Sequence, residues 1–184
     1  VFHKVGNLPM IFHVLNASKL LKPKTISVVI SNELIKYKNV IKKNSKNIKF
    51  AIQSKQLGTA DAVRCALKEK HSTNSNISII LYGDTPLISH ISLKKCLERF
   101  KKRNSDLCVL SMTPPDTNHS YGRLITKKDR LEKIIEKSES KNNQNLENLC
   151  NTGIMLVKTK HLIEKLRKIN NRNNKKEFFL TDLI

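Results

Sequence analysis

The fold of this chain is decided by the stretch Ser78-Ile79-Ile80-Leu81-Tyr82-Gly83-Asp84-Thr85-Pro86-Leu87. Its apolar, partly β-branched first half predicts a strand buried on both faces, as in a parallel sheet. Its second half predicts the loop that leaves the carboxyl end of that strand, which is the edge where open α/β sheets bind ligands. Asp84 in this loop can hold a divalent cation against a phosphate. The alternative is a carboxylate that caps a turn before Pro86.

Short apolar runs alternate with helical patterns on both sides of this stretch. We expect strands at residues 25–30, 48–52, 78–82 and 106–112, and helices that begin near Pro9 and that span 33–42, 60–70 and 93–102. A repeated strand–helix order predicts a parallel sheet with right-handed crossovers. The sequence therefore predicts the doubly wound, mostly parallel α/β class.

The pattern changes after Pro115. We expect two short strands at 121–125 and 131–136 around a turn at 127–129, an exposed polar loop at 138–148, a strand at 150–157, a helix at 160–168 and a helical segment at 177–184. Gly153 lies inside the strand at 150–157. A glycine inside a strand often permits the close approach of a ligand.

Length and composition allow one α/β domain with a real core, since 39% of the 184 residues are hydrophobic. There is no apolar run long enough to span a membrane. The opening residues do not resemble a signal peptide, so we expect a cytoplasmic protein. Because the chain does not begin with Met, we also expect it to be a fragment.

The formal net charge of +20 would suit nucleic acid or a membrane surface. The lysines, however, are spread among Asn, Ile and Ser, and no zinc-finger, homeodomain or RNA-recognition motif is present. This pattern favours a solvated basic surface that attracts anionic substrates such as nucleotides. A nucleic-acid binder remains the alternative, and it predicts binding that falls steeply with salt.

Neither the cysteines nor the histidines follow the spacing of a known metal-binding or redox motif. The four cysteines, at positions 65, 96, 108 and 150, form no C-x-x-C motif, and the six histidines show no metal-ligand spacing. Disulfide frameworks belong mainly to small secreted chains. We therefore expect reduced, mostly buried thiols and no histidine metal site.

Polar and glycine-containing segments at the same edge of the predicted sheet form an ordered set. The set is Gln53, Gln56-Leu57-Gly58-Thr59, Leu81 to Ile88, Tyr121-Gly122-Arg123, Glu136, Asn151-Thr152-Gly153-Ile154 and Glu177 to Asp182. It closely resembles the pyrophosphorylase domain of the bacterial bifunctional N-acetylglucosamine-1-phosphate uridyltransferase/glucosamine-1-phosphate acetyltransferase family. The resemblance covers nearly the whole chain, and the ordered spacing is more specific than any single motif.

The resemblance implies a Rossmann-like nucleotidyltransferase fold and a magnesium-dependent reaction. UTP and N-acetylglucosamine 1-phosphate would give UDP-N-acetylglucosamine, a precursor of peptidoglycan and lipopolysaccharide, and pyrophosphate. It places the nucleotide in the half at about 1–115 and the sugar in the half at about 116–184. The alternatives are another sugar-1-phosphate nucleotidyltransferase and a non-catalytic nucleotide-sugar-binding protein.

The resemblance assigns the nucleotide to Gln53, Gly58, Thr59, Tyr82, Gly83 and Asp84. The Gln53 amide would pair with donor and acceptor groups of uracil. Gly58 and Thr59 would direct helix N-terminal N–H groups at the ligand, and Asp84 would bind Mg²⁺. The structural alternatives are an exposed loop Gln, a helix-capping Thr and a tyrosine that fills the core.

The sugar is assigned to Gly122, Glu136, Asn151 and Thr181. Gly122 would offer its backbone, while Glu136 and Asn151 would hydrogen-bond hydroxyl or acetamido groups. The alternatives are an exposed ion pair between Glu136 and Lys137, which contributes little, and a threonine in a helix interior for Thr181.

The chain departs from the family pattern at both ends. It lacks the first strand and the glycine-rich Ala-Gly-x-Gly-Thr-Arg-Met loop with its following lysine, and it lacks the later asparagine that binds metal and the β-helix acetyltransferase domain. We therefore expect impaired catalysis from the chain as given, because the absent Arg and Lys would stabilise the departing pyrophosphate. A homotrimer is expected only where the β-helix domain is present.

Overall fold

The structure is a computed structural model that describes residues 1–43, 48–68, 75–116, 119–128, 130–136 and 149–184. The expected loop at 138–148 lies outside these residues, as do the last two residues of the helix expected at 60–70. Within the described residues the chain forms five α-helices and three groups of paired strands. The α/β class is confirmed.

The N-terminal part begins with a small hairpin and continues into a parallel strand pair. Its elements are β1 (Lys4–Val5), β2 (Leu8–Pro9), α1 (Met10–Lys19), β3 (Ile26–Ile30), a 3₁₀ helix (Asn32–Tyr37), α2 (Lys38–Lys43) and β4 (Ile48–Ile52). β3 and β4 pair in parallel with Ile26 opposite Ile48. The helix expected at 33–42 is therefore a 3₁₀ helix that continues into a short α-helix.

The second sheet contains five strands, and the strand pairs described in it are all antiparallel, so the expectation of a mostly parallel sheet holds only for β3 and β4. The five strands are β5 (Ile77–Ile80), β6 (Leu107–Met112), β7 (Arg123–Lys127), β8 (Arg130–Ile135) and β9 (Cys150–Lys158). β9 pairs antiparallel with β5, β6 and β7. β5 and β6 therefore run in the same direction with β9 between them. The two sequence halves share this sheet.

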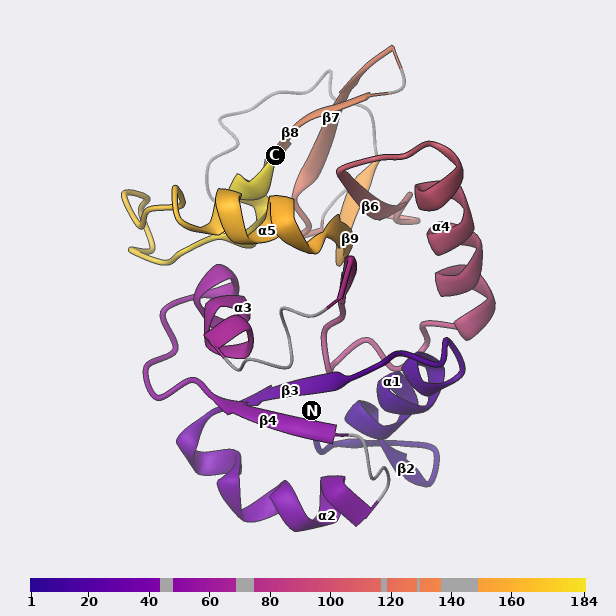
Figure 1. Ribbon diagram of the computed structural model, residues 1–184, viewed down its shortest axis with the longest axis vertical. Coiled ribbons are helices and arrows are strands. Elements are labelled where there is room, and N and C mark those ends of the chain that lie inside the picture. The colour runs from indigo at the N-terminus through magenta and orange to yellow at the C-terminus, as the bar shows by residue number, and fades with distance from the viewer. Residues whose placement is uncertain (44–47, 69–74, 117–118, 129, 137–148) are drawn as a thin grey trace.

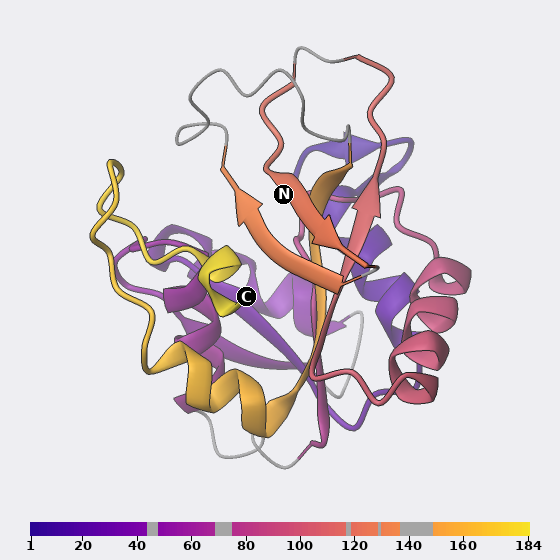
Figure 2. The ribbon, with the colours of Figure 1, turned by 90° about the horizontal axis from the view of Figure 1, so that it is seen from above.

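Helices cover both faces of the second sheet (Figures 1 and 2). α3 (Thr59–Lys68) and α5 (Thr159–Leu166) lie on one side, and α4 (His90–Lys102) lies on the other. The buried stripe of α4 is Leu93, Cys96 and Phe100, at helical spacing. α4 begins three residues earlier than expected, because Ser89 caps it by accepting a hydrogen bond from the N–H of Ser92 at 3.0 Å.

A cavity of about 700 Å³ separates the β3–β4 pair from the second sheet. Its walls are mostly apolar and come from α1, β3, α3 and β5, with Val14, Val28 and Ile80 among the lining residues. Tyr82, Gly83 and Asp84 also line it. The loop expected to bind ligands therefore borders this cavity.

The prediction of a helix over 177–184 is wrong for the first three residues. Only Leu180–Leu183 form a helical turn, of the 3₁₀ type, and Phe179 before it is extended with φ −79° and ψ 130°. The cause is a long-range contact. The N–H of Phe178 donates to the carbonyl of Leu57 at 2.8 Å, and the carbonyl of Phe178 accepts from Ala60 at 3.0 Å. These bonds hold the backbone extended against the start of α3.

Candidate functional site

Gln53 follows β4 and is fixed by hydrogen bonds inside the protein. Its amide Nε2 donates to the carbonyl of Gly58 at 3.0 Å and to Oδ2 of Asp61 at 2.9 Å. A primary amide has two N–H donors and one acceptor oxygen. Both N–H donors of the Gln53 amide are therefore used inside the protein, and the expected pairing with donor and acceptor groups of a base is not possible in full. Only the amide oxygen is left to accept a hydrogen bond from a ligand.

Gly58 lies where the loop after β4 meets the C-terminal segment. It has φ +110°, and a methyl group built on it would lie 2.6 Å from the carbonyl oxygen of Phe178. Only glycine fits this close backbone approach. Because the N–H of Ala60 already donates to Phe178, that donor at the start of α3 is not available to an anion. The predicted ligand contacts of this helix start are therefore limited to its remaining N–H groups.

Thr59 joins three parts of the chain. Its Oγ1 accepts a hydrogen bond from the N–H of Leu180 at 3.0 Å. It is also hydrogen-bonded to the hydroxyl of Tyr82. The side chain thus links the start of α3 to the C-terminal segment and to the loop after β5.

Tyr82 packs against Gly153 in β9. A methyl group built on Gly153, which has φ +81°, would lie 2.1 Å from Cε2 of Tyr82. The close approach that this glycine permits is therefore made by the Tyr82 ring. Burial raises the pKa of the Tyr82 hydroxyl, and the nearby Glu136 and Asp84 carboxylates act in the same direction, while the hydrogen bond from Thr59 opposes them.

Gly83 and Asp84 lie at the end of the large cavity. Gly83 packs against Val1, whose Cγ1 would be 3.2 Å from a methyl group built on the glycine. Asp84 is exposed, and no group of three His, Cys, Asp or Glu side chains suited to a metal is found in the described part of the chain. A single exposed carboxylate fits Mg²⁺, which commonly takes its other ligands from water and substrate phosphates.

The residues expected to bind the sugar form a second cluster. Thr181 donates through Oγ1 to Oε1 of Glu136 at 3.0 Å. The N–H of Asn151 donates to the carbonyl of Gly122 at 2.8 Å. A methyl group built on Gly122 would lie 3.1 Å from Cγ2 of Ile134 and 3.4 Å from Oε2 of Glu136, so this glycine packs directly beside the carboxylate.

The two clusters meet through Tyr82 and the C-terminal segment. Oδ1 of Asn151 accepts a hydrogen bond from the N–H of Gly153 at 2.8 Å, and the ring of Tyr82 packs against Gly153. Thr59 and Glu136 are held by Leu180 and Thr181, which are consecutive residues. The structure therefore brings the predicted site residues into one connected region, although their roles toward a ligand stay predictions.

Two residues that shape this region were not singled out from the sequence. Asp61 holds the Gln53 amide. Arg64 lies over the ring of Phe178 at 4.4 Å and donates to the carbonyls of Leu166 and Ile169 at 2.6 and 2.8 Å. Asp61 is eight residues from Gln53, near enough to suggest a loop contact. The partners of Arg64 are more than 100 residues away, and no local pattern points to them.

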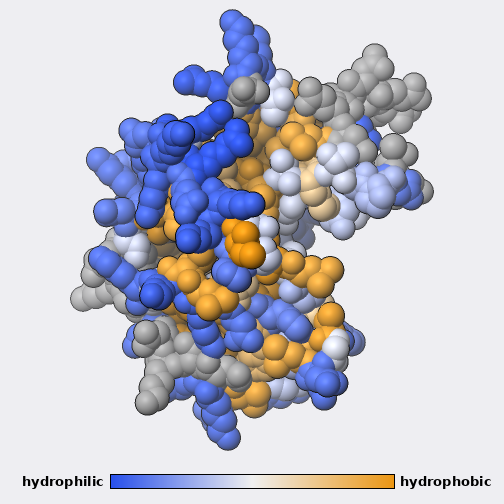
Figure 3. Space-filling model, turned by 90° about the vertical axis from the view of Figure 1, so that its right-hand side faces the viewer, coloured by the Kyte–Doolittle hydropathy of each residue, from blue (hydrophilic) through white to orange (hydrophobic). Residues whose placement is uncertain are grey.

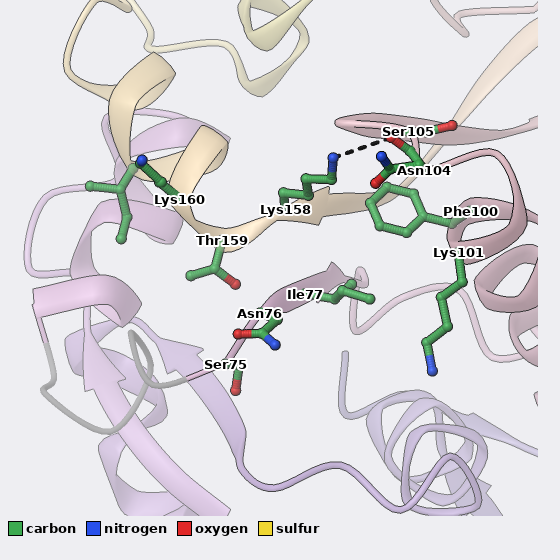
Figure 4. Close-up of a pocket in the computed structure, with 11 residues that line it drawn as sticks. Ser75, Asn76, Ile77, Phe100, Lys101, Asn104, Ser105, Lys158, Thr159 and Lys160 are labelled. Atoms are coloured by element: carbon green, nitrogen blue, oxygen red, sulfur yellow. Dashed lines mark hydrogen bonds between the residues drawn. The ribbon is translucent and has the colours of Figure 1, made fainter.

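A second cavity, of about 580 Å³, lies near the beginning of β5, away from the candidate site (Figure 4). Asn76 and Ile77 line it together with Phe100 and Lys158. Nζ of Lys158 pairs with Asp106 at 2.9 Å and donates to the carbonyl of Asn104 at 3.2 Å. None of the predicted site residues lines this cavity.

The surface around α4 carries both hydrophilic and apolar residues (Figure 3). Figure 3 looks onto the side that carries α4 and shows hydrophilic residues gathered over its upper part, with apolar patches below. Leu87 and Ile91 are exposed apolar residues near the start of α4. In the described residues no helix has the length and apolar character needed to cross a membrane.

Comparisons with known sequences cover the whole chain. The nucleotidyl transferase family matches residues 1–184. The bifunctional protein GlmU of Brucella anthropi is 35% identical over 184 residues, and that of Thermosipho melanesiensis is 37% identical over 184 residues. All of this chain is covered in both cases, but it spans only 40% and 39% of the length of these relatives.

Solved structures give the same fold. A UDP-glucose pyrophosphorylase complexed with UDP-glucose matches with a TM-score of 0.77 at 14% identity, over 99% of this chain and 75% of that one. A putative glucose-1-phosphate thymidylyltransferase from Bacillus anthracis matches with a TM-score of 0.73 at 19% identity, over 99% and 71%. The predicted Rossmann-like nucleotidyltransferase fold is confirmed, and the chain belongs to the nucleotidyl transferase family.

Proposed function

We propose that this chain carries the substrate-binding part of an enzyme that transfers a uridylyl group from UTP to N-acetylglucosamine 1-phosphate. The products are UDP-N-acetylglucosamine and pyrophosphate. The relatives named GlmU and the family match support this substrate pair. The observation that carries the proposal is the connected region in which Thr59 and Tyr82 meet Glu136 and Thr181 through the C-terminal segment.

In this proposal the nucleotide lies along the loop after β4 and the loop after β5. The Gln53 amide oxygen accepts the N–H of uracil. Gly58, Thr59 and Gly83 let the nucleotide approach the backbone, and Tyr82 supplies a wall that excludes water from one side. Such positioning lowers the entropic barrier of a reaction between two bound substrates.

The sugar phosphate lies beside Gly122, Glu136, Asn151 and Thr181. Glu136 and Asn151 hydrogen-bond hydroxyl or acetamido groups, and Thr181 orients the Glu136 carboxylate. Gly122 provides space and backbone contact. This arrangement turns the phosphate of the sugar toward the nucleotide, where it acts as the attacking group in an in-line transfer.

Asp84 is the residue that would hold Mg²⁺ in the proposal. When bound, Mg²⁺ neutralises charge on the phosphate oxygens, which nucleotidyl transfer requires. The exposed position of Asp84 leaves room for water and phosphate ligands. The basic surface, with a formal net charge of +20, draws both anionic substrates toward the site.

The first test is a calorimetric titration of the chain with UTP in Mg²⁺ and in EDTA. Asp84→Asn should weaken UTP binding in Mg²⁺ by about tenfold or more, equal to about 1.4 kcal/mol, and should leave binding in EDTA unchanged. Glu98→Gln, which removes an exposed carboxylate on α4, is the matched control and should bind as the native chain does. Equal affinities for Asp84→Asn and the control would contradict the metal role.

The second test separates the substrates. Thr181→Val should weaken the binding of N-acetylglucosamine 1-phosphate and leave UTP binding unchanged, while Thr113→Val on the exposed loop after β6 changes neither. A panel of nucleoside triphosphates and sugar 1-phosphates then tests specificity. If the chain prefers another nucleotide and sugar phosphate, that pair replaces the proposed substrates. If the whole protein binds UDP-N-acetylglucosamine but forms no product, a non-catalytic role is favoured.

The proposal puts the protein in the cytoplasm, the compartment that holds UTP. Its partners are the two small-molecule substrates rather than a specific nucleic acid or a membrane. Titration with a DNA or RNA duplex at two salt concentrations checks this, because a nucleic-acid binder would lose affinity steeply as salt rises.

A further inference from the structure

Two cysteines outside the candidate site lie in contact between α4 and β6. Sγ of Cys96 is 3.7 Å from Sγ of Cys108. Cys96 belongs to the buried stripe of α4, and Cys108 lies on the face of β6 that packs against it. The sulfurs therefore face each other across a packed contact between a helix and a sheet, where neither backbone is part of an exposed loop.

The surroundings hold both thiols in place. Phe100 and Leu156 are buried beside them, and Leu156 is the residue of β9 that pairs with Cys108. Because this layer is packed on both sides, the pair is presented in one geometry. A disulfide needs a sulfur–sulfur distance of about 2.05 Å, so the sulfurs must move about 1.7 Å closer. Side-chain rotation and a small shift of α4 supply a movement of this size.

The two thiols are chemically unequal. The hydrogen bond between the two sulfurs, helped by Arg99 and Arg103, lowers the pKa of Cys108 to about 7. The same hydrogen bond raises the pKa of Cys96, and burial adds to that effect. Cys108 is also the more exposed residue of the two. It therefore meets the criteria for the attacking thiolate, with Cys96 as the resolving partner.

We infer that Cys96 and Cys108 form a modification site that a small-molecule disulfide, such as oxidised glutathione, converts to an intramolecular disulfide. The Cys108 thiolate attacks one sulfur of the reagent and releases the first glutathione thiolate. The Cys96 sulfur, after losing its proton, attacks Cys108 and releases the second. Two protein thiols are oxidised, one reagent disulfide is reduced, and no other co-reactant is needed.

This inference is independent of the proposed function. The bond would join α4 to β6 and close a short loop of chain. α4 begins at His90, directly after the loop that carries Asp84. The arginines next to the pair also favour an anionic reagent such as oxidised glutathione, because both side chains are exposed and positively charged.

The test is mass spectrometry of the native chain after incubation with oxidised glutathione. The intact mass should fall by two hydrogen atoms, with no glutathione retained. A tryptic digest without reductant should link the peptide 96–99 to the peptide 104–123, since cleavage follows Lys95, Arg99, Arg103 and Arg123. A retained glutathione, a different cysteine pairing or an unchanged mass would each overturn the inference.

Two variants identify the roles of the sulfurs. Cys96→Ser should retain one glutathione on Cys108, because no resolving thiol remains. Cys65→Ser on α3 is the matched control and should close the disulfide as the native chain does. A glutathione found on Cys65 or Cys150 instead of Cys108 in Cys96→Ser would show that Cys108 is not the attacking residue. Circular dichroism of each variant before oxidation confirms that these results come from folded protein.

Discussion

Substitution of Gly153 by alanine tests the packing on which the candidate site depends. Gly153 has φ +81°, and the added methyl group would lie 2.1 Å from Cε2 of Tyr82. The left-handed backbone costs an alanine about 1–2 kcal/mol, and displacing a packed ring costs about 1–3 kcal/mol. Gly153→Ala should therefore lower the free energy of unfolding by about 2–5 kcal/mol, which is a large share of the stability of an ordinary domain.

Gly6→Ala provides the control because it separates backbone strain from the ring contact. Gly6 has φ +62°, and a methyl group built there meets no atom within 4 Å. Both substitutions carry the same change in unfolded-chain entropy, so the difference between them reports the contact with Tyr82. Urea unfolding followed by circular dichroism measures both. Equal losses in the free energy of unfolding for the two variants would refute the conclusion that position 153 must be glycine to make room for the Tyr82 ring.

A double-mutant cycle locates the clash. If the Tyr82 ring is the obstacle, then removing it in Tyr82→Ala should make the additional Gly153→Ala change cost about 1–3 kcal/mol less than in the native chain. The single Tyr82→Ala variant is itself destabilised, so the quantity to compare is the coupling free energy between the two substitutions. A coupling near zero would mean that the alanine methyl group is accommodated by movement of β9.

Three further outcomes are expected from the same unfolding assay. Burial raises the pKa of Tyr82 above its ordinary value of 10.0, so the unfolded chain ionises first and stability should fall as the pH rises past that value; Tyr82→Phe should show less of this fall. Arg64→Met should cost about 2–3 kcal/mol, because it removes two hydrogen bonds to the end of α5 and the contact with Phe178. Ser89→Ala should cost about 1 kcal/mol through loss of the α4 cap, whereas Ser54→Ala in the exposed loop should change little.

The strands from β3 onwards and most helices could be predicted because their signals are local, whereas the small β1–β2 hairpin was not predicted. Ile26–Ile30 and Ile77–Ile80 are rich in Ile and Val, and both are strands. The direction of β9 could not be predicted in the same way. Sequence order suggested parallel crossovers, but the β7–β8 hairpin returns the chain so that β9 enters antiparallel between β5 and β6.

The identities of the site residues followed from a resemblance, whereas their contacts did not. Gly153 was expected to admit a ligand, and the structure fills that space with the ring of Tyr82. Gln53 was expected to offer its whole amide, and Asp61 takes one of its two donors. The residues at 177–179 looked helical, but their backbone bonds to the loop after β4. In each case a tertiary contact overrides a local preference.

The C-terminal segment links the residues proposed for the nucleotide to those proposed for the sugar. Leu180 donates its N–H to Thr59, which belongs to the first group, and the next residue, Thr181, donates its hydroxyl to Glu136, which belongs to the second. A single peptide unit therefore connects the two anchor points, and the backbone bonds of Phe178 fix that unit against α3. Because the two anchor points are one residue apart, we expect a change at the start of α3 to shift the Glu136 carboxylate as well. In the proposed function, the separation of the two substrates would therefore depend on backbone contacts in this segment as well as on the side chains that touch them.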